Sequence, residues 1–440
     1  VAQPLERGSN NYYSIIQGRY HSMKRCLSMF LVLVLVFSFC GNALAEDGKT
    51  VIHFWHCHSG AAADAHAYLV DAFNASQDEI EVVLEYEANS YYDLNSKVKA
   101  AILAGNAPEV SLGEVMTMAN LVKTNTIQPL DSYIATDDSF DYEDYAEGVK
   151  TNTIIDGQVY GMPYQRSTAI MFYNKTMLRE AGLNEDGPST FEELEEMAKA
   201  LTKDGQVGMV QQLTAWIHEI LVDCFGGTMI NEEQTEVTFN SENAMKAIEF
   251  YRNGMAEGWL EMKVGGTATA DARLEFQNMR SAFIIDSTGT MATYKDYADG
   301  MGFELGTCVL PGVASSAGGC NLVMINGLDE EKAQAAWTFL KFMNSYEAAL
   351  YTTEQTGYLP ILNSLIDGPE MAALYESEPF FKTAALQVQH IVSRPTNEGY
   401  TEVNNELLNV LTELVLDPEL DAQATMDAFA QEANEILASY

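Results

Sequence analysis

The sequence predicts an α/β fold with more than one lobe. In the first part of the chain, short apolar strands alternate with helices, and repeats of this kind produce a parallel sheet covered by helices. The chain has 440 residues, of which 47% are apolar and 10% aromatic, a content typical of a folded core. Because a single core stops growing at roughly 250–300 residues, we expect a chain of this length to divide into two or more lobes.

The first strands and helices follow from local patterns. Apolar side chains in the segment 80–86 alternate with glutamates at positions 81 and 85, which is the pattern of a half-buried strand. Gly105 is a typical helix stop. The predicted order is a strand at 51–55, a helix at 61–74, a strand at 80–86, a helix at 91–103 and a strand at 110–112. Ligands of such sheets lie at the carboxyl ends of the strands.

After residue 163 the pattern becomes mainly helical. In the segment 329–345, apolar residues recur at helical spacing and form one wide stripe. Trp337 lies on this stripe, so we expect it in the core. Helices are predicted at 189–200, 213–224, 241–258, 329–345, 402–416 and 425–439.

The amino terminus is typical of an export signal. Met23 precedes two basic residues, and the apolar run at 27–40 is shorter than the roughly 20 residues of a membrane span but suits a signal peptide. Small residues after the run complete a cleavage site. We therefore expect residues 1–22 to be a non-native upstream extension, 23–45 to be a signal peptide, and the remaining protein to be extracytoplasmic. A lipid-modified Cys40 is the competing interpretation.

Charge and cysteine usage exclude several classes. With 24 Lys and Arg against 63 Asp and Glu, the chain carries a net charge of −39. Nucleic acids and anionic membranes bind through Lys and Arg, so neither is expected as a partner. Beyond the leader, Cys57, Cys224, Cys308 and Cys320 are too dispersed for a small disulfide scaffold. Cys308 and Cys320 either pair across a short loop or remain buried free thiols.

Six short motifs occur in a characteristic order along the chain. They are FWH at 54–56, GNAP at 105–108, IQPLD at 127–131, YGMP at 160–163, YNK at 173–175 with AGL at 181–183, and TGYLP at 356–360. This order resembles the extracellular solute-binding proteins of ABC importers, family 1, and in particular the members that bind sn-glycerol 3-phosphate. The resemblance extends from about residue 51 to the carboxyl terminus.

The resemblance implies a type II periplasmic-binding-protein-like fold, in which a hinge joins two lobes and the ligand binds in the cleft between them. It assigns 46–162 with 308–356 to lobe 1 and 163–307 with 357–440 to lobe 2. It implies a monomeric receptor rather than an enzyme, without cofactor or metal. The receptor would capture sn-glycerol 3-phosphate, a glycerophosphodiester or a sugar and deliver it to ABC permease subunits. Its place would be the periplasm, or the cell surface if lipid-anchored.

The same resemblance points to ligand-binding residues. These are Tyr91, Glu114, Ser167, Trp216, Ser287, Gly319 and Tyr358. Each also has a structural interpretation. Tyr92 is an equally plausible neighbour of Tyr91, Glu114 suits a helix N-terminus, Ser287 suits a helix cap, and Trp216 suits an interlobe core. Tyr358, in the TGYLP turn, matches the family best.

One departure concerns the phosphate. The glycerol-phosphate binders hold it with an arginine before the last two helices, where this sequence has EGYTE at 398–402. Only Arg166 and Arg394 adjoin cleft motifs, so a phosphate would depend on one of these together with helix N-termini. A bidentate arginine is hard to replace. The sequence therefore favours neutral sugars, polyols and glycerophosphodiesters over glycerol 3-phosphate.

The run HFWHCH at 53–58 raises two alternatives, a metal site and a catalytic cysteine activated by a histidine. In a strand, His56 and His58 share one face and Cys57 takes the other, so the run does not gather three metal ligands without a sharp turn. Two other classes of protein remain as alternatives to a transport receptor. They are a metal-binding surface receptor and a secreted hydrolase of sugars or phosphodiesters. A hydrolase needs a pair of acid and base side chains, and Glu114 alone does not make one.

Overall fold

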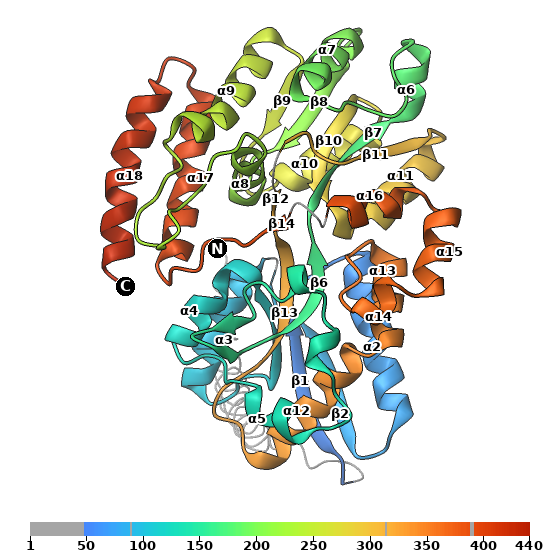
Figure 1. Cartoon of the computed structure of the whole chain (residues 1–440), viewed down its shortest axis with the longest axis vertical. Coiled ribbons are helices and arrows are strands. Elements are labelled where there is room, and N and C mark those ends of the chain that lie inside the picture. The colour runs from blue at the N-terminus through green and yellow to red at the C-terminus, as the bar shows by residue number, and fades with distance from the viewer. Residues whose placement is uncertain (1–47, 89, 313–314, 388–390) are drawn as a thin grey trace, which may run out of the picture. The chain divides into compact units, whose positions relative to one another are not determined.

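Two five-stranded sheets, one in each lobe, organise the chain between Thr50 and Tyr440, which forms one compact unit. The structure is a computed structural model that describes residues 48–88, 90–312, 315–387 and 391–440 (Figure 1). The predicted upstream extension, the signal peptide and Cys40 lie outside the described residues. Among the described residues, no helix is long and apolar enough to cross a membrane.

The first sheet contains the three strands predicted near the amino terminus and two strands from later in the chain. Its strands are β1 (Thr50–His56), β2 (Ile80–Tyr86), β3 (Val110–Glu114), β6 (Met162–Ser167) and β13 (Gly318–Met324). Their order across the sheet is β2-β1-β3-β13-β6. β1 runs parallel to β2 and β3, as predicted, whereas β13 runs antiparallel to β3 and β6. The carboxyl ends of β1 and β3 therefore lie at the same edge of the sheet.

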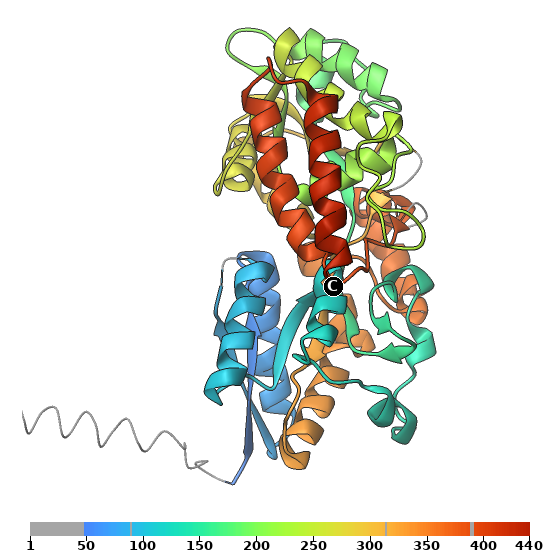
Figure 2. The ribbon, with the colours of Figure 1, turned by 90° about the vertical axis from the view of Figure 1, so that its left-hand side faces the viewer.

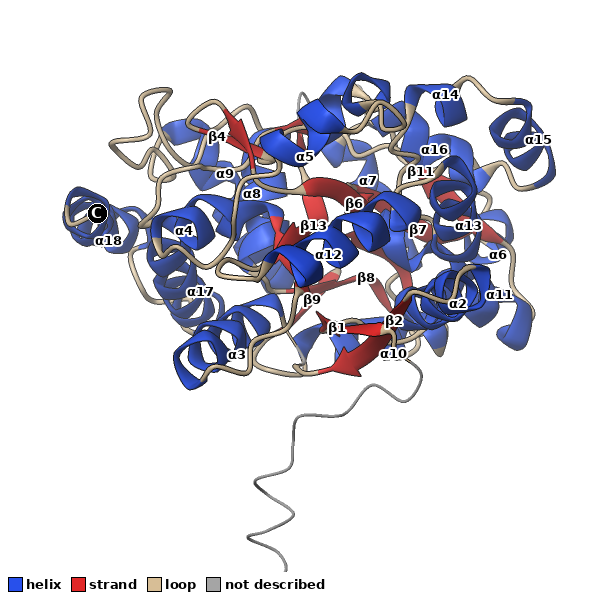
Figure 3. Cartoon of the chain, turned by 90° about the horizontal axis from the view of Figure 1, so that it is seen from below, coloured by secondary structure: helices blue, strands red, loops and turns tan. Residues whose placement is uncertain are grey.

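Helices cover both faces of this sheet and share its core. They are α2 (Ala61–Ser76), α3 (Tyr91–Ala104), α4 (Met118–Lys123), α5 (Asp131–Thr136), α12 (Glu330–Met343), α13 (Tyr346–Thr356), α14 (Asn363–Ile366) and α15 (Pro369–Ser377). α3 ends at Gly105, which has the left-handed backbone that glycine tolerates. Trp337 is buried in the core of this lobe, as predicted. α12 packs against β1 and β13, and Figure 3 shows it beside these strands.

The second sheet was not recognised from the sequence, which suggested a mainly helical segment. Its strands are β7 (Ala169–Asn174), β8 (Val207–Gln212), β9 (Leu260–Lys263), β10 (Ser281–Ser287) and β11 (Leu305–Cys308). They lie in the order β11-β7-β10-β8-β9. Every residue of β7 is buried, and alternate residues pack into separate cores on the two faces of the sheet. A strand buried on both faces lacks the polar alternation that reveals a strand in a sequence.

The helices of the second lobe enclose this sheet. They are α6 (Lys175–Glu180), α7 (Phe191–Leu201), α8 (Ala215–Cys224), α9 (Glu242–Glu257), α10 (Ala268–Gln277), α11 (Met291–Met301), α16 (Phe380–Gln387), α17 (Tyr400–Leu416) and α18 (Ala422–Ala438). The last two helices were predicted, and they pack side by side against the core of this lobe (Figure 2).

Short elements complete the chain. They are the strands β4 (Ile154–Ile155), β5 (Gln158–Val159), β12 (Ser315–Ser316) and β14 (Ile391–Val392), and the 3-10 turns η1 (Val115–Thr117), η2 (Tyr142–Asp144), η3 (Glu147–Val149) and η4 (Thr288–Thr290). β12 and β14 pair with each other beside α8, close to where the chain passes between the lobes.

The chain changes lobe at positions that differ from the expected limits. β6 keeps it in the first sheet to Ser167, past the expected limit at Met162, and β7 of the second sheet begins at Ala169. After α13, Leu359 packs in a core of the second lobe, whereas α14 and α15 pack against α13 in the first. The segment after 356 thus contributes to both lobes. The local pattern of a crossing strand does not reveal which sheet it joins.

Candidate functional site

His58 and Tyr91 meet at the carboxyl edge of the first sheet. β1 ends at His56, and the chain continues through Cys57 and His58 toward the start of α2. Tyr91 is the first residue of α3, which Ser90 caps by accepting a hydrogen bond from the Asp93 N–H. His58 Nε2 lies 2.6 Å from the Tyr91 hydroxyl. The strand end and the helix start therefore place both side chains at the edge where ligands of parallel sheets bind.

Tyr358 connects the two lobes at this edge. It follows Gly357, whose φ of 93° ends α13 in the left-handed region. Its ring stacks on His58 of the first lobe, with ring centroids 6.2 Å apart and an interplanar angle of 23°. A Cβ at Gly289, which follows β10 of the second lobe, would lie 2.5 Å from the Tyr358 ring. The ring thus lies between groups of both lobes.

Trp216 forms a second aromatic contact between the lobes. It lies in the first turn of α8, and its indole N–H donates to the Ala317 carbonyl at 3.2 Å. A Cβ at Gly318 would lie 2.5 Å from the indole and 2.6 Å from Ser167 Oγ. The bare glycine therefore allows the indole, the β13 backbone and the Ser167 hydroxyl to approach one another.

Gly319 occupies a position that only glycine fills without strain. Its φ is 87°, and a Cβ there would lie 2.1 Å from the Gln165 carbonyl. The pairing between β13 and β6 shifts register at this point. The predicted Gly319 and Ser167 thus lie on adjacent strands, beside Trp216.

Ser287 has the capping role that was its structural interpretation. Its Oγ accepts a hydrogen bond from the Gly289 N–H at 3.1 Å at the start of η4. The preceding Asp286 receives hydrogen bonds from Arg273 at 2.7 and 3.1 Å. Gly289 in turn contacts Tyr358. Ser287 therefore lies two residues from the cluster formed by the rings of His58, Tyr91 and Tyr358, which we call the ring cluster.

Arg394 bridges carboxylates of the two lobes. It is 2% exposed, and it donates to both oxygens of Glu219 on α8, at 2.7 and 3.0 Å, and to Glu114 at the end of β3, at 2.7 Å. Burial raises the pKa of Glu114, and the charge of Arg394 opposes that rise. With the contact to the Met116 sulfur included, four of the five N–H groups of Arg394 are occupied.

Arg166 is buried without an acidic partner among the described residues. Its guanidinium donates to the carbonyl and hydroxyl of Thr151, at 3.0 and 2.7 Å, and more weakly to Asn321 at 3.5 Å. Burial lowers its pKa to about 10. Both arginines singled out from the sequence therefore have internal hydrogen-bond partners.

The sequence analysis missed Gln165. This residue is 1% exposed and has a φ of 42°, a conformation that is strained for a side chain other than glycine. Both atoms of its amide lack a hydrogen-bond partner among the described residues. Buried polar atoms without partners are rare, so the amide is available to a ligand. Its only sequence signal was its place beside the chosen Arg166 and Ser167.

The metal and nucleophile alternatives lack support in the described part of the chain. There, no group of three or more His, Cys, Asp or Glu side chains could hold a metal ion. Burial raises the pKa of Cys57 far above its usual value, which is the opposite of nucleophile activation. Cys308 and Cys320 are free thiols on strands of different sheets, so the pairing considered from sequence does not occur.

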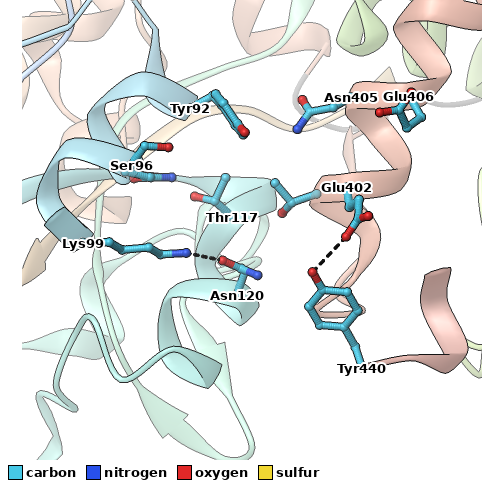
Figure 4. A pocket seen from close by; sticks show the side chains of 11 residues that line it. Tyr92, Ser96, Lys99, Thr117, Asn120, Glu402, Asn405, Glu406 and Tyr440 are labelled. Carbon is cyan, nitrogen blue, oxygen red and sulfur yellow. Dashed lines mark hydrogen bonds between the residues drawn. The ribbon is translucent and has the colours of Figure 1, made fainter.

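A polar cavity of about 430 Å³ lies beside this site, between α3, η1 and α4 of one lobe and α17 and Tyr440 of the other (Figure 4). In it Lys99 donates to Asn120 at 2.7 Å, and the Tyr440 hydroxyl donates to Glu402 at 3.0 Å. Tyr92, the alternative to Tyr91, lines this cavity. Of the two neighbouring tyrosines, Tyr91 therefore contacts His58, whereas Tyr92 lines the polar cavity.

Two sheet-based lobes whose side chains meet along the crossing strands define a solute-binding protein of the periplasmic type. The chain belongs to the bacterial extracellular solute-binding protein family, whose sequence profile matches residues 68–379. It is 25% identical over 433 residues to the sn-glycerol-3-phosphate-binding periplasmic protein UgpB of Escherichia coli, covering 92% of this chain and 96% of that protein.

Solved structures have the same fold. UgpB from Mycobacterium tuberculosis in complex with glycerophosphocholine superposes with a TM-score of 0.80 at 24% identity, covering 89% of this chain and 99% of the other. The GacH receptor of Streptomyces glaucescens, solved unliganded and with acarbose, also has a TM-score of 0.80, at 21% identity and the same coverage. The two-lobe fold expected from the sequence is confirmed.

Proposed function

We propose that this chain is the receptor of an ABC importer, which captures a small carbohydrate, polyol or glycerophosphodiester by hinge closure and delivers it to the permease. The observation that carries the proposal is the pair of aromatic side chains, Trp216 and Tyr358, each in contact with groups of both lobes. Aromatic faces at a lobe junction suit the C–H surfaces of a polyol, and the adjacent Ser167 and Gln165 offer hydrogen bonds to its hydroxyls.

The charges near the ring cluster favour a ligand without a net charge. Arg394 is paired with Glu114 and Glu219, and Arg273 is paired with Asp286. Because these charges compensate one another, the groups that remain for a ligand are mostly neutral donors and acceptors. This supports a neutral sugar or a zwitterionic glycerophosphodiester over glycerol 3-phosphate. The ligands named for the two solved relatives, acarbose and glycerophosphocholine, belong to these classes.

The remaining parts of the proposal follow from the family. The protein binds and releases its ligand without turnover, acts as a monomer outside the cytoplasm, and is exported by the segment 23–45. Its ligand-binding residues are Tyr91, Glu114, Ser167, Trp216, Ser287, Gly319 and Tyr358, with Gln165 added. Arg166 and Arg394 contribute positive charge near the site but do not contact the ligand directly.

Titration calorimetry on the chain from Glu46 onward tests the proposal. The probes are glycerophosphocholine, maltose, acarbose and sn-glycerol 3-phosphate, and we expect micromolar or tighter binding of at least one of the first three. Tyr358→Ala and Trp216→Ala should each weaken that binding by about tenfold or more, about 1.4 kcal/mol. The control is Tyr92→Ala, because Tyr92 lies on the same edge but lines the polar cavity beside the site. This variant should bind the probes with unchanged affinity. Absence of binding by all four probes would contradict the proposed ligand class.

A further inference from the structure

Four buried or half-buried side chains form a continuous hydrogen-bonded chain that ends at the proposed binding site. Tyr164 OH lies 3.0 Å from His66 Nδ1, His66 Nε2 lies 3.1 Å from His58 Nδ1, and His58 Nε2 lies 2.6 Å from Tyr91 OH. The two imidazole rings stack nearly parallel, at 11°. We call these residues the Tyr–His chain. The family resemblance assigned no role to His58, His66 or Tyr164.

Both imidazoles of the Tyr–His chain are neutral. His66 is fully buried and His58 is half-buried, and burial lowers the pKa of His58 to about 4 and that of His66 further below its usual value. A neutral imidazole has one N–H donor and one bare acceptor nitrogen. When two neutral imidazoles follow each other in a hydrogen-bonded chain, both donate in the same direction. All hydrogen bonds of the Tyr–His chain therefore point either toward Tyr91 or toward Tyr164.

The buried end determines the direction. Tyr164 is 1% exposed, and His66 Nδ1 is the only hydrogen-bond partner of its hydroxyl among the described residues. If the chain ran the other way, the Tyr164 proton would be buried without an acceptor, which is strongly disfavoured. Tyr164 therefore donates to His66, His66 to His58, and His58 to Tyr91.

The hydroxyl proton of Tyr91 then has no acceptor within the Tyr–His chain. With its oxygen accepting from His58, the hydroxyl donates to another atom. The Cys320 thiol is adjacent: burial raises its pKa, and the interaction with the Tyr91 hydroxyl opposes this rise. Sulfur is a weak acceptor, so an oxygen atom of a ligand would replace it favourably.

We propose that the Tyr–His chain presets Tyr91 as a hydrogen-bond donor to an acceptor oxygen of the ligand, with His58, His66 and Tyr164 as positioning residues. The inference rests on the proposed function of the same site and deepens it. The ligand atom opposite Tyr91 is an oxygen with a free lone pair, either a hydroxyl or ether oxygen of a sugar or a phosphoryl oxygen of a phosphodiester.

The direction of the chain is measurable without any ligand. Nitrogen-15 NMR of histidine-labelled protein separates protonated from bare ring nitrogens, and His58→Gln and His66→Gln variants assign the signals. We expect both histidines to carry the proton on Nε2 over the neutral pH range. Protons on Nδ1 of both, or a charged ring, would overturn the proposal. Tyr164→Phe should abolish the single tautomer. Tyr251→Phe, which removes a buried hydroxyl in the other lobe, should not change the two signals.

Binding provides the second measurement, with glycerophosphocholine and maltose as the probes. Tyr91→Phe should weaken the affinity for the probe by about five- to tenfold, and Tyr164→Phe should weaken it by about two- to fivefold. In the Tyr91→Phe background, Tyr164→Phe should have no further effect, because Tyr164 acts through Tyr91. Equal losses in both backgrounds would show a merely structural role and refute the proposal. If neither probe binds, the proposed ligand class fails, whereas the NMR result still decides the direction of the chain.

Discussion

Replacing Arg394 by methionine tests whether this arginine joins the lobes or is reserved for a ligand. The substitution keeps a long side chain of similar volume but removes every donor. It leaves Glu219, which is fully buried on α8, and Glu114, at the end of β3, without their cation. The perturbation is thus the loss of one charge from a buried group of three.

The expected loss follows from the burial of the partners. Removing one member of a buried ion pair typically costs about 3–5 kcal/mol, because the remaining charge is left uncompensated. Glu114 loses the charge that opposes the rise of its pKa, so its carboxyl group becomes easier to protonate. A protonated Glu114 needs no cation, and the loss should therefore be larger at pH 8 than at pH 5.

Urea unfolding followed by tryptophan fluorescence measures the free energy of unfolding at both pH values. Arg394→Met with Glu219→Gln should recover part of the loss, because one uncompensated charge is removed as well. Arg179→Met is the control, since Arg179 is an exposed arginine with two acidic partners, and it should produce no measurable change. A loss below about 1 kcal/mol for Arg394→Met, equal at both pH values, would refute the reasoning and favour an arginine held for a ligand.

Three further predictions concern stability. Burial raises the pKa of Asp223 to about 7, so the folded state keeps a proton that the unfolded state loses; stability should fall by roughly 3–4 kcal/mol between pH 4 and pH 7, and urea titrations of Asp223→Asn should lack this slope. Gly319→Ala should lose about 1–3 kcal/mol from backbone strain alone and more from the clash with the Gln165 carbonyl, whereas normal thermal unfolding would contradict this. Trp337→Ala should lose about 3–5 kcal/mol in urea, and a loss under 1 kcal/mol would remove Trp337 from the core.

Local patterns were sufficient for the elements whose two faces differ. β2 alternates glutamates with apolar residues, and α17 and α18 have one apolar side, so all three were predicted. β7 was missed because both of its faces are buried. A strand of this kind and a buried helix have the same composition, and only the packing distinguishes them.

The predicted site residues show the same limit. The motifs led to Ser167, Gly319 and Tyr358, which the structure places on or beside the crossing strands, and Trp216 and Tyr358 each contact groups of both lobes. No motif revealed that Gln165 is buried with an unpaired amide, because burial depends on the other strands of the sheet. These assignments stay predictions until a ligand is measured.

The sequence by itself determined the family, the first three strands and first two helices of the first sheet, and the absence of a small disulfide scaffold, because these depend on neighbouring residues and short motifs. Only the tertiary structure decided what each polar group contacts. Arg394 pairs with Glu114 across 280 positions of the chain, and His66 pairs with Tyr164 across 98. Charges and hydrogen bonds act over a few ångströms of space, so the partner of a buried group is set by the packing of distant strands and not by sequence spacing.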